Sequence, residues 1–375
     1  MKAGWETRKL GALCQIRTGK KDVNQGNPDG LYPFFTCAAE HTFSDSYSFD
    51  TEALLIAGNG NVGQVSYYKG RFEAYQRTYV LSDFSNVLSR YLFLILDGKL
   101  KETVSKQKLG NTMPYIKVGM LTDFQVPIPP VDEQRRIVTL LDEAFADIAT
   151  AKANAEKNLQ NARALFESHL QAIFSTRGAN WEDKTLEQIS TTFGRGKSRH
   201  RPRNDPALYG GKYPFVQTGD VRNAEHIITE FSQTYSEAGL AQSKLWPKGT
   251  ICITIAANIA ETGILGFDAC FPDSVIGVVP NSNEAEVGYV EYVLQSFKAR
   301  LQALGQGSAQ ANINMGTFEN ERFPFPKVEE QRGIVAKLDA LSEESQHLEN
   351  IYRQKLTALD DLKKSLLHQA FSGQL

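Results

Sequence analysis

The chain contains one signature twice, 197 positions apart. Residues 127–142 read PIPPVDEQRRIVTLLD and residues 324–339 read PFPKVEEQRGIVAKLD, with ten of the sixteen positions identical. The alignment runs without a gap to the end of each copy, where Phe174 matches Phe371. A period this long exceeds the unit of a solenoid, so it indicates a duplicated domain. Two similar modules in one chain suggest a pseudo-symmetric target.

Length and charge bound the class of protein. At 375 residues, two domains with separate cores are the natural expectation. Residues 1–130 carry 15 Lys and Arg against 12 Asp and Glu, whereas residues 181–323 carry 13 against 16, and the net charge of the chain is −2. The protein is therefore not a uniformly basic DNA binder. Any nucleic-acid surface must be local or completed by a partner protein.

The sequence also predicts the compartment. No run approaches the roughly 20 apolar residues of a membrane helix, and the opening MKAGWETRKLG lacks the apolar core of a secretory signal. The four cysteines are scattered without a C-x-x-C pair, at Cys14, Cys37, Cys252 and Cys270. We therefore expect a cytoplasmic protein with reduced cysteines, no membrane partner and no zinc site.

Each copy opens with a mixed globular part. Short β-like runs flank connections rich in Gly and Asn, which predicts two hairpins, one in each copy. One amphipathic helix is expected beside each hairpin, so the fold class is α+β. The hairpin runs are 53–57 with 64–68 and 250–256 with 264–267, and the helices are 89–101 and 287–304.

A long helix is expected after each signature. Pro130 at the start and the acidic Asp132 and Glu133 in the first turn favour a helix N-terminus. Apolar residues then follow alternating steps of four and three residues, as in a heptad seam. The first seam is expected at Leu141, Phe145, Ile148, Ala155, Leu159, Ala162, Phe166 and Ile173, and the second at Leu338, Leu341, Leu348, Tyr352, Leu359, Leu362 and Leu366.

The long helices need a partner. Each spans about 40 residues, roughly 60 Å at 1.5 Å per residue, and one apolar stripe of that length must be buried. The other copy is the nearest partner, and the alanines of the first seam would allow a close approach. We expect an antiparallel coiled coil with one globular domain at each end and the N- and C-termini within about 30 Å, half the helix length. The alternative is that each helix packs only on its own domain.

Catalytic motifs are weak. The run from Gly58 to Gly63 matches G-x-G-x-x-G, but its continuation into Gln64–Tyr68 is typical of a second strand rather than of the helix that holds a pyrophosphate. No P-loop occurs, and the six histidines lack metal-ligand spacing. The sequence therefore indicates no catalytic constellation and no cofactor bound by this chain.

The clearest candidate for a nucleic-acid contact is a basic loop. Five fixed positive charges fall within residues 195–203, where Gly and Pro disfavour regular structure, and such a loop can contact phosphates or guanine. The aligned run 17–21 of the first copy is also basic. The candidate DNA-binding residues are Arg17, Lys20, Lys21, Arg71, Gln76, Arg77, Lys197, Arg199, His200, Arg201, Arg203, Gln217 and Thr218.

Together these features resemble the specificity subunits of type I restriction-modification systems. The resemblance covers essentially the whole chain and rests on the doubled signature P-x-P-x-x-(D/E)-E-Q-x-x-I-V-x-x-L-D, the long helix after each copy, and the runs 110–116 and 307–313. It implies a non-catalytic reader of double-stranded DNA. The chain would be joined by two methyltransferase subunits that bring S-adenosylmethionine, and the complex can recruit two restriction subunits that use ATP and Mg²⁺.

The resemblance also assigns roles along the chain. Residues 1–130 and 178–326 would be target-recognition domains that each read one half of a bipartite site. Residues 131–177 and 327–375 would be spacer helices that dock the methyltransferase subunits. The two globular cores diverge after their openings, so we expect different half-sites and an asymmetric full site.

Two other functions fit parts of the sequence. One is a coiled-coil scaffold whose globular ends bind protein or carbohydrate. The other is a nucleotide-dependent enzyme that uses the loop from Gly58 to Gly63. Substitution of Arg199, Arg201 and Arg203 separates the DNA reader from the scaffold, because only the reader would show a shallower salt dependence of binding.

Overall fold

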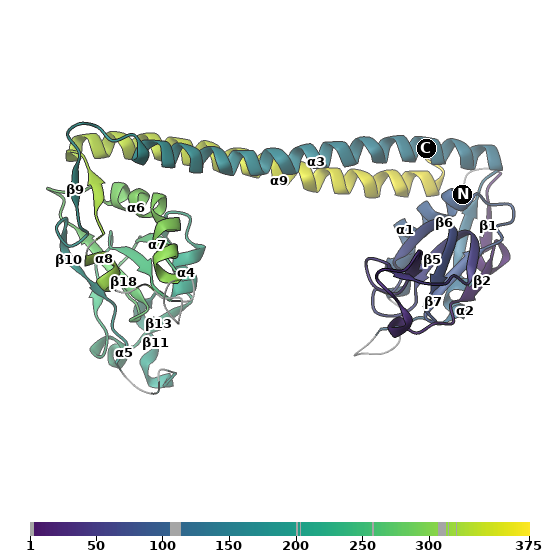
Figure 1. Cartoon of the computed structure of the whole chain (residues 1–375), viewed down its shortest axis with the longest axis horizontal. Helices are drawn as coiled ribbons and strands as arrows, with labels where there is room; N and C mark the ends of the chain where they lie inside the picture. Colours follow the sequence, from purple (N-terminus) through teal and green to yellow (C-terminus); the bar gives the residue numbers. More distant parts are fainter. Residues whose placement is uncertain are drawn as a thin grey trace. The chain divides into compact units, whose positions relative to one another are not determined.

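The computed structural model describes residues 4–105, 114–199, 202, 204–256, 259–306, 313, 315–319 and 321–375. Its contacts divide the chain into two compact units. Unit 1 comprises Met1–Lys157 together with Tyr352–Leu375, and unit 2 comprises Asn158–Ile351. Each unit therefore holds one globular domain and a part of each of the two long helices, α3 (Val131–Ser175) and α9 (Val328–Ser372) (Figure 1).

The globular domain of unit 1 is built on a mixed sheet with the strand order β2-β7-β5-β6-β3-β4. Helix α1 packs its apolar face on this sheet, and residues of α3 and α9 complete the core. In chain order the elements are β1 (Glu6–Lys9), η1 (Leu10–Ala12), β2 (Gln15–Thr18), η2 (Val23–Gln25), β3 (Tyr32–Phe35), β4 (Thr42–Ser44), β5 (Phe49–Ala57), β6 (Val65–Ala74), β7 (Thr78–Ser82), α1 (Ser89–Ser105), α2 (Val118–Thr122) and β8 (Gln125–Ile128).

The globular domain of unit 2 includes a sheet ordered β10-β18-β15-β16-β12, a sheet ordered β13-β11-β17-β14 and the two-stranded sheet β19-β9. Its first elements are β9 (Glu182–Lys184), β10 (Ser190–Arg195), η3 (Pro206–Leu208), β11 (Tyr209–Phe215), α4 (Thr218–Asn223), β12 (Ile227–Ile228), β13 (Gln233–Tyr235), α5 (Glu237–Ala241) and β14 (Leu245–Trp246). They are followed by β15 (Ile251–Thr254), β16 (Thr262–Leu265), β17 (Ala269–Cys270), β18 (Val275–Pro280), α6 (Val287–Ser296), α7 (Lys298–Gln306), α8 (Met315–Glu319) and β19 (Phe323–Phe325).

Both predicted hairpins are present. Strands β5 and β6 pair antiparallel with Ala53 opposite Tyr68, and β15 and β16 pair antiparallel with Ile251 opposite Ile264. The loop from Gly58 to Gly63 thus connects two strands and opens no helix. The dinucleotide-binding alternative loses its structural basis, because no helix N-terminus stands there to hold a pyrophosphate.

The predicted helix at 89–101 is confirmed as α1, which continues to Ser105. The single helix expected at 287–304 is wrong, since α6 ends at Ser296 and α7 begins at Lys298. Between them the N–H of Phe297 bonds the carbonyls of Val293 and Gln295 and closes the first helix. The ring of Phe297 packs against Phe323 at 5.2 Å, so core packing breaks a run that helix propensity alone would have continued.

The antiparallel coiled coil is confirmed within each unit. In unit 1, Lys152 of α3 pairs with Asp360 of α9 at 2.8 Å, and Phe145, earlier in α3, lies under Lys363, later in α9. In unit 2, the hydroxyl of Ser345 donates to the carbonyl of Ala162 at 2.8 Å. Such a contact between a side chain and the facing backbone requires the close approach that small seam residues permit.

One predicted seam residue is wrong. The side chain of Leu362 is 47% exposed, whereas Lys363 occupies the inner face and its ammonium lies 5.1 Å from the ring centroid of Phe145. An α-helix has 3.6 residues per turn, so its apolar stripe drifts away from a strict seven-residue count. Leu165, which matches Leu362 in the first repeat, is 49% exposed.

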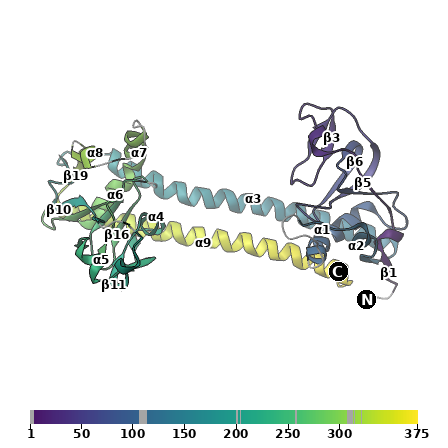
Figure 2. The ribbon, with the colours of Figure 1, turned by 90° about the horizontal axis from the view of Figure 1, so that it is seen from below.

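Each long helix ends on the globular domain of the other repeat. Phe371 at the end of α9 packs edge-on against Tyr91 of α1, with ring centroids 5.7 Å apart. Phe174 at the end of α3 packs in the same way against Tyr289 of α6, at 5.5 Å. The alternative in which each helix packs only on its own domain is therefore wrong. Trp5 and Phe371 share one core cluster, so the first described residues and the end of α9 lie together in unit 1, as expected (Figure 2).

Candidate nucleic-acid interface

A glycine anchors the start of the basic run in each repeat. Gly19 follows β2 and Gly196 follows β10, and both are buried. A Cβ on Gly19 would overlap the carbonyl of Ala74, and one on Gly196 would overlap the carbonyl of Phe271. Only glycine permits backbones to approach this closely. The following lysines, Lys20 and Lys197, therefore leave the sheet at corresponding places and are both exposed.

In unit 1, the fold brings four predicted residues together. The N–H of Gln76 donates to the carbonyl of Lys21 at 3.0 Å, which joins the loop after β2 to the turn between β6 and β7. Lys20 and Arg77, which flank this hydrogen bond along the chain, are exposed and form no ion pair in the part of the chain that the structure describes. Arg77 and Gln76 also line a cavity of about 280 Å³. This corner presents free positive charge together with an amide, the chemistry that suits contacts to phosphates and bases.

The side chains of Lys21 and of the remaining predicted residues of unit 1 have partners inside the domain. The ammonium of Lys21 lies 3.4 Å from the buried carboxylate of Glu73, so it neutralises a charge in the core. Arg17 donates to Ser82 at 2.9 Å. Arg71 pairs with Asp50 at 3.0 Å, which raises the pKa of its guanidinium. These contacts give all three residues a structural role. Among the described residues, no contact joins Arg71 to Lys20 or Arg77.

In unit 2, Lys197 and Arg199 are exposed, whereas His200, Arg201 and Arg203 lie outside the described residues. Gln217 caps α4, because its N–H donates to the carboxylate of Asp220 at 2.8 Å. Thr218 is half-buried in the first turn of that helix. No contact in the described ranges joins Gln217 or Thr218 to the basic loop.

Sequence reasoning missed the segment that supports this loop. Between α5 and β14, the side-chain oxygen of Gln242 accepts the N–H of Arg199 at 2.6 Å. The hydroxyl of Ser243 donates to the carbonyl of Lys197 at 2.8 Å. Lys244 follows directly in the chain. A short polar run carries no sequence signal of its own, so these partners emerge only when the fold places them beside the loop.

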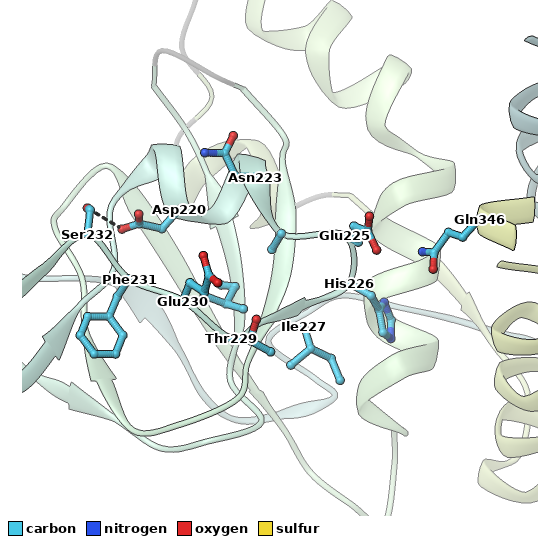
Figure 3. A pocket seen from close by; sticks show the side chains of 12 residues that line it. Asp220, Asn223, Glu225, His226, Ile227, Thr229, Glu230, Phe231, Ser232 and Gln346 are labelled. Carbon is cyan, nitrogen blue, oxygen red and sulfur yellow. Dashed lines mark hydrogen bonds between the residues drawn. The ribbon is translucent and has the colours of Figure 1, made fainter. Parts of the chain in front are cut away.

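A hollow of unit 2 has the wrong charge for DNA. It measures about 680 Å³ and is lined by Asp220, Glu225 and Glu230 among others (Figure 3). Gln346 of α9 faces Glu225 and His226 across it (Figure 3). Three carboxylates would repel a phosphate backbone, so we exclude this hollow from the DNA interface.

His226 at the rim of this hollow connects the domain to α9. Its Nδ1 lies 2.9 Å from the fully buried carboxylate of Glu291, and its ring stacks on Tyr292, with centroids 4.8 Å apart. The hydroxyl of Tyr292 donates to Asp339 of α9 at 2.7 Å. Burial lowers the pKa of His226, but the hydrogen bond to Glu291 and the nearby carboxylates outweigh it and raise the pKa overall.

Metal-binding groups and reactive thiols were sought among the described residues. These residues hold no group of three or more His, Cys, Asp and Glu side chains placed to bind a metal ion. Burial raises the pKa of the Cys14 thiol to about 12, so this side chain is a poor nucleophile. No helix among them is long and apolar enough to cross a membrane.

Two known proteins are similar to nearly the whole of this chain. The EcoDI specificity subunit of a type I restriction enzyme from Escherichia coli is 27% identical, over 99% of this chain and 88% of its own length. The MjaVIII specificity subunit from Methanocaldococcus jannaschii is 22% identical, over 99% of this chain and 93% of its own length.

Solved structures share the fold. The HsdS subunit from Thermoanaerobacter tengcongensis has a TM-score of 0.60 at 18% identity, over 100% of this chain and 98% of that one. A chain solved in work on complex assembly and conformational transition of the type I R-M system has a TM-score of 0.80 at 17% identity, over 100% and 99% of the two chains. The model of the type I restriction modification DNA specificity domain matches residues 2–159 and again 179–358. The chain therefore belongs to the type I restriction-modification DNA specificity family.

Proposed function

We propose that this chain reads an asymmetric, bipartite DNA site as the specificity subunit of a type I restriction-modification complex. Its family is that of non-catalytic subunits, and the observation that carries the proposal is the repeated corner at Gly19-Lys20 and Gly196-Lys197. Each corner presents an exposed cation from a backbone that is locked in place. Two such corners, one in each repeat, suit two half-sites on one duplex.

The recognition role falls to residues 1–130 and 178–326 in this proposal. The surroundings of the two corners differ, which supports different half-sites. In the first domain Gln76 and Arg77 stand beside Lys20. In the second, Gln242 and Ser243 support the loop of Lys197. Different side chains around the two corners would read different bases.

The spacer and docking role falls to residues 131–177 and 327–375. Leu165 and Leu362 occupy the same place in the two repeats, and both remain half-exposed on the long helices. Exposed leucines at equivalent positions suit two copies of one partner. We infer that two adenine methyltransferase subunits dock there, bind S-adenosylmethionine, and in the cytoplasm can recruit two restriction subunits that use ATP and Mg²⁺.

The test is co-expression with the methyltransferase gene of the same host, followed by methylation-sensitive sequencing of the host DNA. Adenine methylation on one split, asymmetric motif would support the proposal and identify both half-sites and the spacer. A co-purified complex without any modified motif would contradict the reading role. Failure to co-purify at all would contradict docking and favour the scaffold function.

A further inference from the structure

Lys244 is held in an unusual position for a surface lysine. Its ammonium lies 3.6 Å from the ring centroid of Trp246, close enough for a strong cation–π contact. The Trp246 ring is buried and stacks on Phe271 at 4.9 Å, so the platform beneath the ammonium is part of the core. Lys244 thus loses much of the mobility of an exposed lysine before any ligand binds, which reduces the entropy cost of binding.

A second cation is fixed beside it. The pKa of Lys244 is lowered, first by partial burial and then by the positive charge of Lys197. Lys197 is held in place because Ser243 bonds its carbonyl, and Gly196 before it packs on the backbone at Phe271. Two like charges that the fold keeps together repel each other unless an anion lies between them.

Arg199 adds a third cation to the same segment, since its N–H bonds the side chain of Gln242, two residues before Lys244. In the described part of the chain, no ion pair includes Lys197, Arg199 or Lys244. Among the described residues, these three cations therefore gather positive charge without a counter-ion. This contrasts with Lys21 in unit 1, whose ammonium neutralises the buried Glu73.

We propose that Lys244, with Lys197 and Arg199, forms a binding site for one phosphodiester group of the DNA backbone. The inference rests on the proposed function and deepens it by naming a contact. An ammonium is a point charge that pairs with phosphate oxygens without reading a base. Lys244 therefore positions the second recognition domain on its half-site and leaves the choice of bases to other side chains.

The experiment uses the full-length chain in complex with its methyltransferase partner. It measures the affinity of this complex for a short DNA duplex at several salt concentrations. For Lys244→Gln we expect weaker binding and a slope of log affinity against log salt that is shallower by about 1. The same loss is expected for a duplex of arbitrary sequence and for one that carries the methylated motif. Lys244→Arg should retain the slope, since it keeps the charge and the stacking on Trp246.

Two controls make the result decisive. Lys248, an exposed lysine of the next turn, should tolerate Lys248→Gln without a change in slope. Lys244→Met keeps an unbranched side chain over Trp246. If this variant shows a shallower salt slope but an unchanged melting temperature, the effect on binding comes from the lost charge and not from lost packing. An unchanged slope for Lys244→Gln and Lys244→Met, or an equal decrease for Lys248→Gln, would overturn the phosphate site. Lys244→Gln could show a shallower salt slope on a duplex of arbitrary sequence while the wild type shows no preference for any motif. That combination would support the phosphate site and contradict the proposed function.

Discussion

Gln134 and Gln331 occupy the same place in the two repeats, and each is completely buried at the start of its long helix. In unit 1, the side-chain oxygen of Gln134 accepts the N–H of Leu88 at 2.8 Å. Its amide nitrogen donates to the carbonyls of Pro129 and Asn86 at 2.9 and 3.3 Å. One side chain thus ties the signature to the segment that leads into α1.

Gln331 repeats this arrangement in unit 2. Its oxygen accepts the N–H of Glu286 at 2.8 Å, and its nitrogen donates to the carbonyls of Pro326 and Glu284 at 2.8 and 3.1 Å. An amide is suited to this place because it donates and accepts at once, which a carboxylate cannot do. The glutamine of the doubled signature therefore joins each globular domain to the helix that follows it.

Removal of this glutamine should destabilise one unit. Gln331→Ala leaves a buried N–H and two carbonyls without their partner, and each unsatisfied buried group costs about 1–3 kcal/mol. We expect a lower free energy of unfolding for the second domain in denaturant titration. Gln346→Ala, at an exposed position of the same helix, is the control. Equal stability of the two variants would contradict the role of Gln331.

The exposed leucines should control partner stoichiometry. Leu362→Glu places a charge where we propose that one methyltransferase subunit docks, so the complex should retain one copy in place of two by native mass spectrometry. Leu165→Glu should remove the other copy. Lys355→Glu, at another exposed position on α9, is the control for added negative charge. A complex that keeps two copies in both leucine variants would rule out this docking surface.

Half-site recognition should be separable by domain. Arg77 is exposed and forms no ion pair with any residue that the structure describes, so Arg77→Gln should reduce methylation through the first half-site. The expected loss corresponds to about 1–3 kcal/mol, the contribution of one base contact. Lys197→Gln with Arg199→Gln should weaken engagement of the second half-site. Methylation-sensitive sequencing of each variant reads both halves in one measurement. Simultaneous change of both half-sites in the Arg77 variant would count against the division of labour.

Helix length should determine the spacer between half-sites. Insertion of seven residues after Lys157 and seven before Tyr352 adds two turns to each long helix, about 10 Å at 1.5 Å per residue, without shifting the seam. The preferred spacer should grow by about one to three base pairs, with both half-sites unchanged. The sequencing assay applied to the insertion variant tests this. A changed half-site with an unchanged spacer would refute the ruler.

The His226–Glu291 pair predicts a pH dependence of stability. The folded-state pKa of His226 is raised above its ordinary 6.5, so its contribution to stability is full below about pH 6.5 and is lost as pH rises through the folded pKa. Asp339 and Glu286 act in the same direction. The melting temperature of the wild type should fall as the pH rises from about 6.5 through the folded pKa of His226. His226→Gln should remove this part of the pH dependence of the melting temperature. His347→Gln, at an exposed position on α9, should behave like the wild type.

Much of the fold follows from local pattern. The doubled signature, with proline before and acidic residues after each helix start, predicts both α3 and α9, and the paired β-like runs predict both hairpins. The break at Phe297 was missed because it depends on Phe323, which no local propensity includes. Leu362 was misplaced because a seven-residue count follows the stripe of a supercoil, whereas the helix turns every 3.6 residues.

The candidate site divides in the same way. The sequence by itself determined that each repeat carries a basic run after the same strand, because a glycine with a lysine behind it is visible in the letters. Only the tertiary structure decided which cations are free. Lys21 and Arg71 meet carboxylates from distant segments, whereas Lys244 lies on Trp246 beside Lys197. The charge of a side chain can be read from the sequence. Whether a ligand can use that charge depends on the neighbours that folding brings within a few ångströms, and several of these neighbours are distant in the sequence.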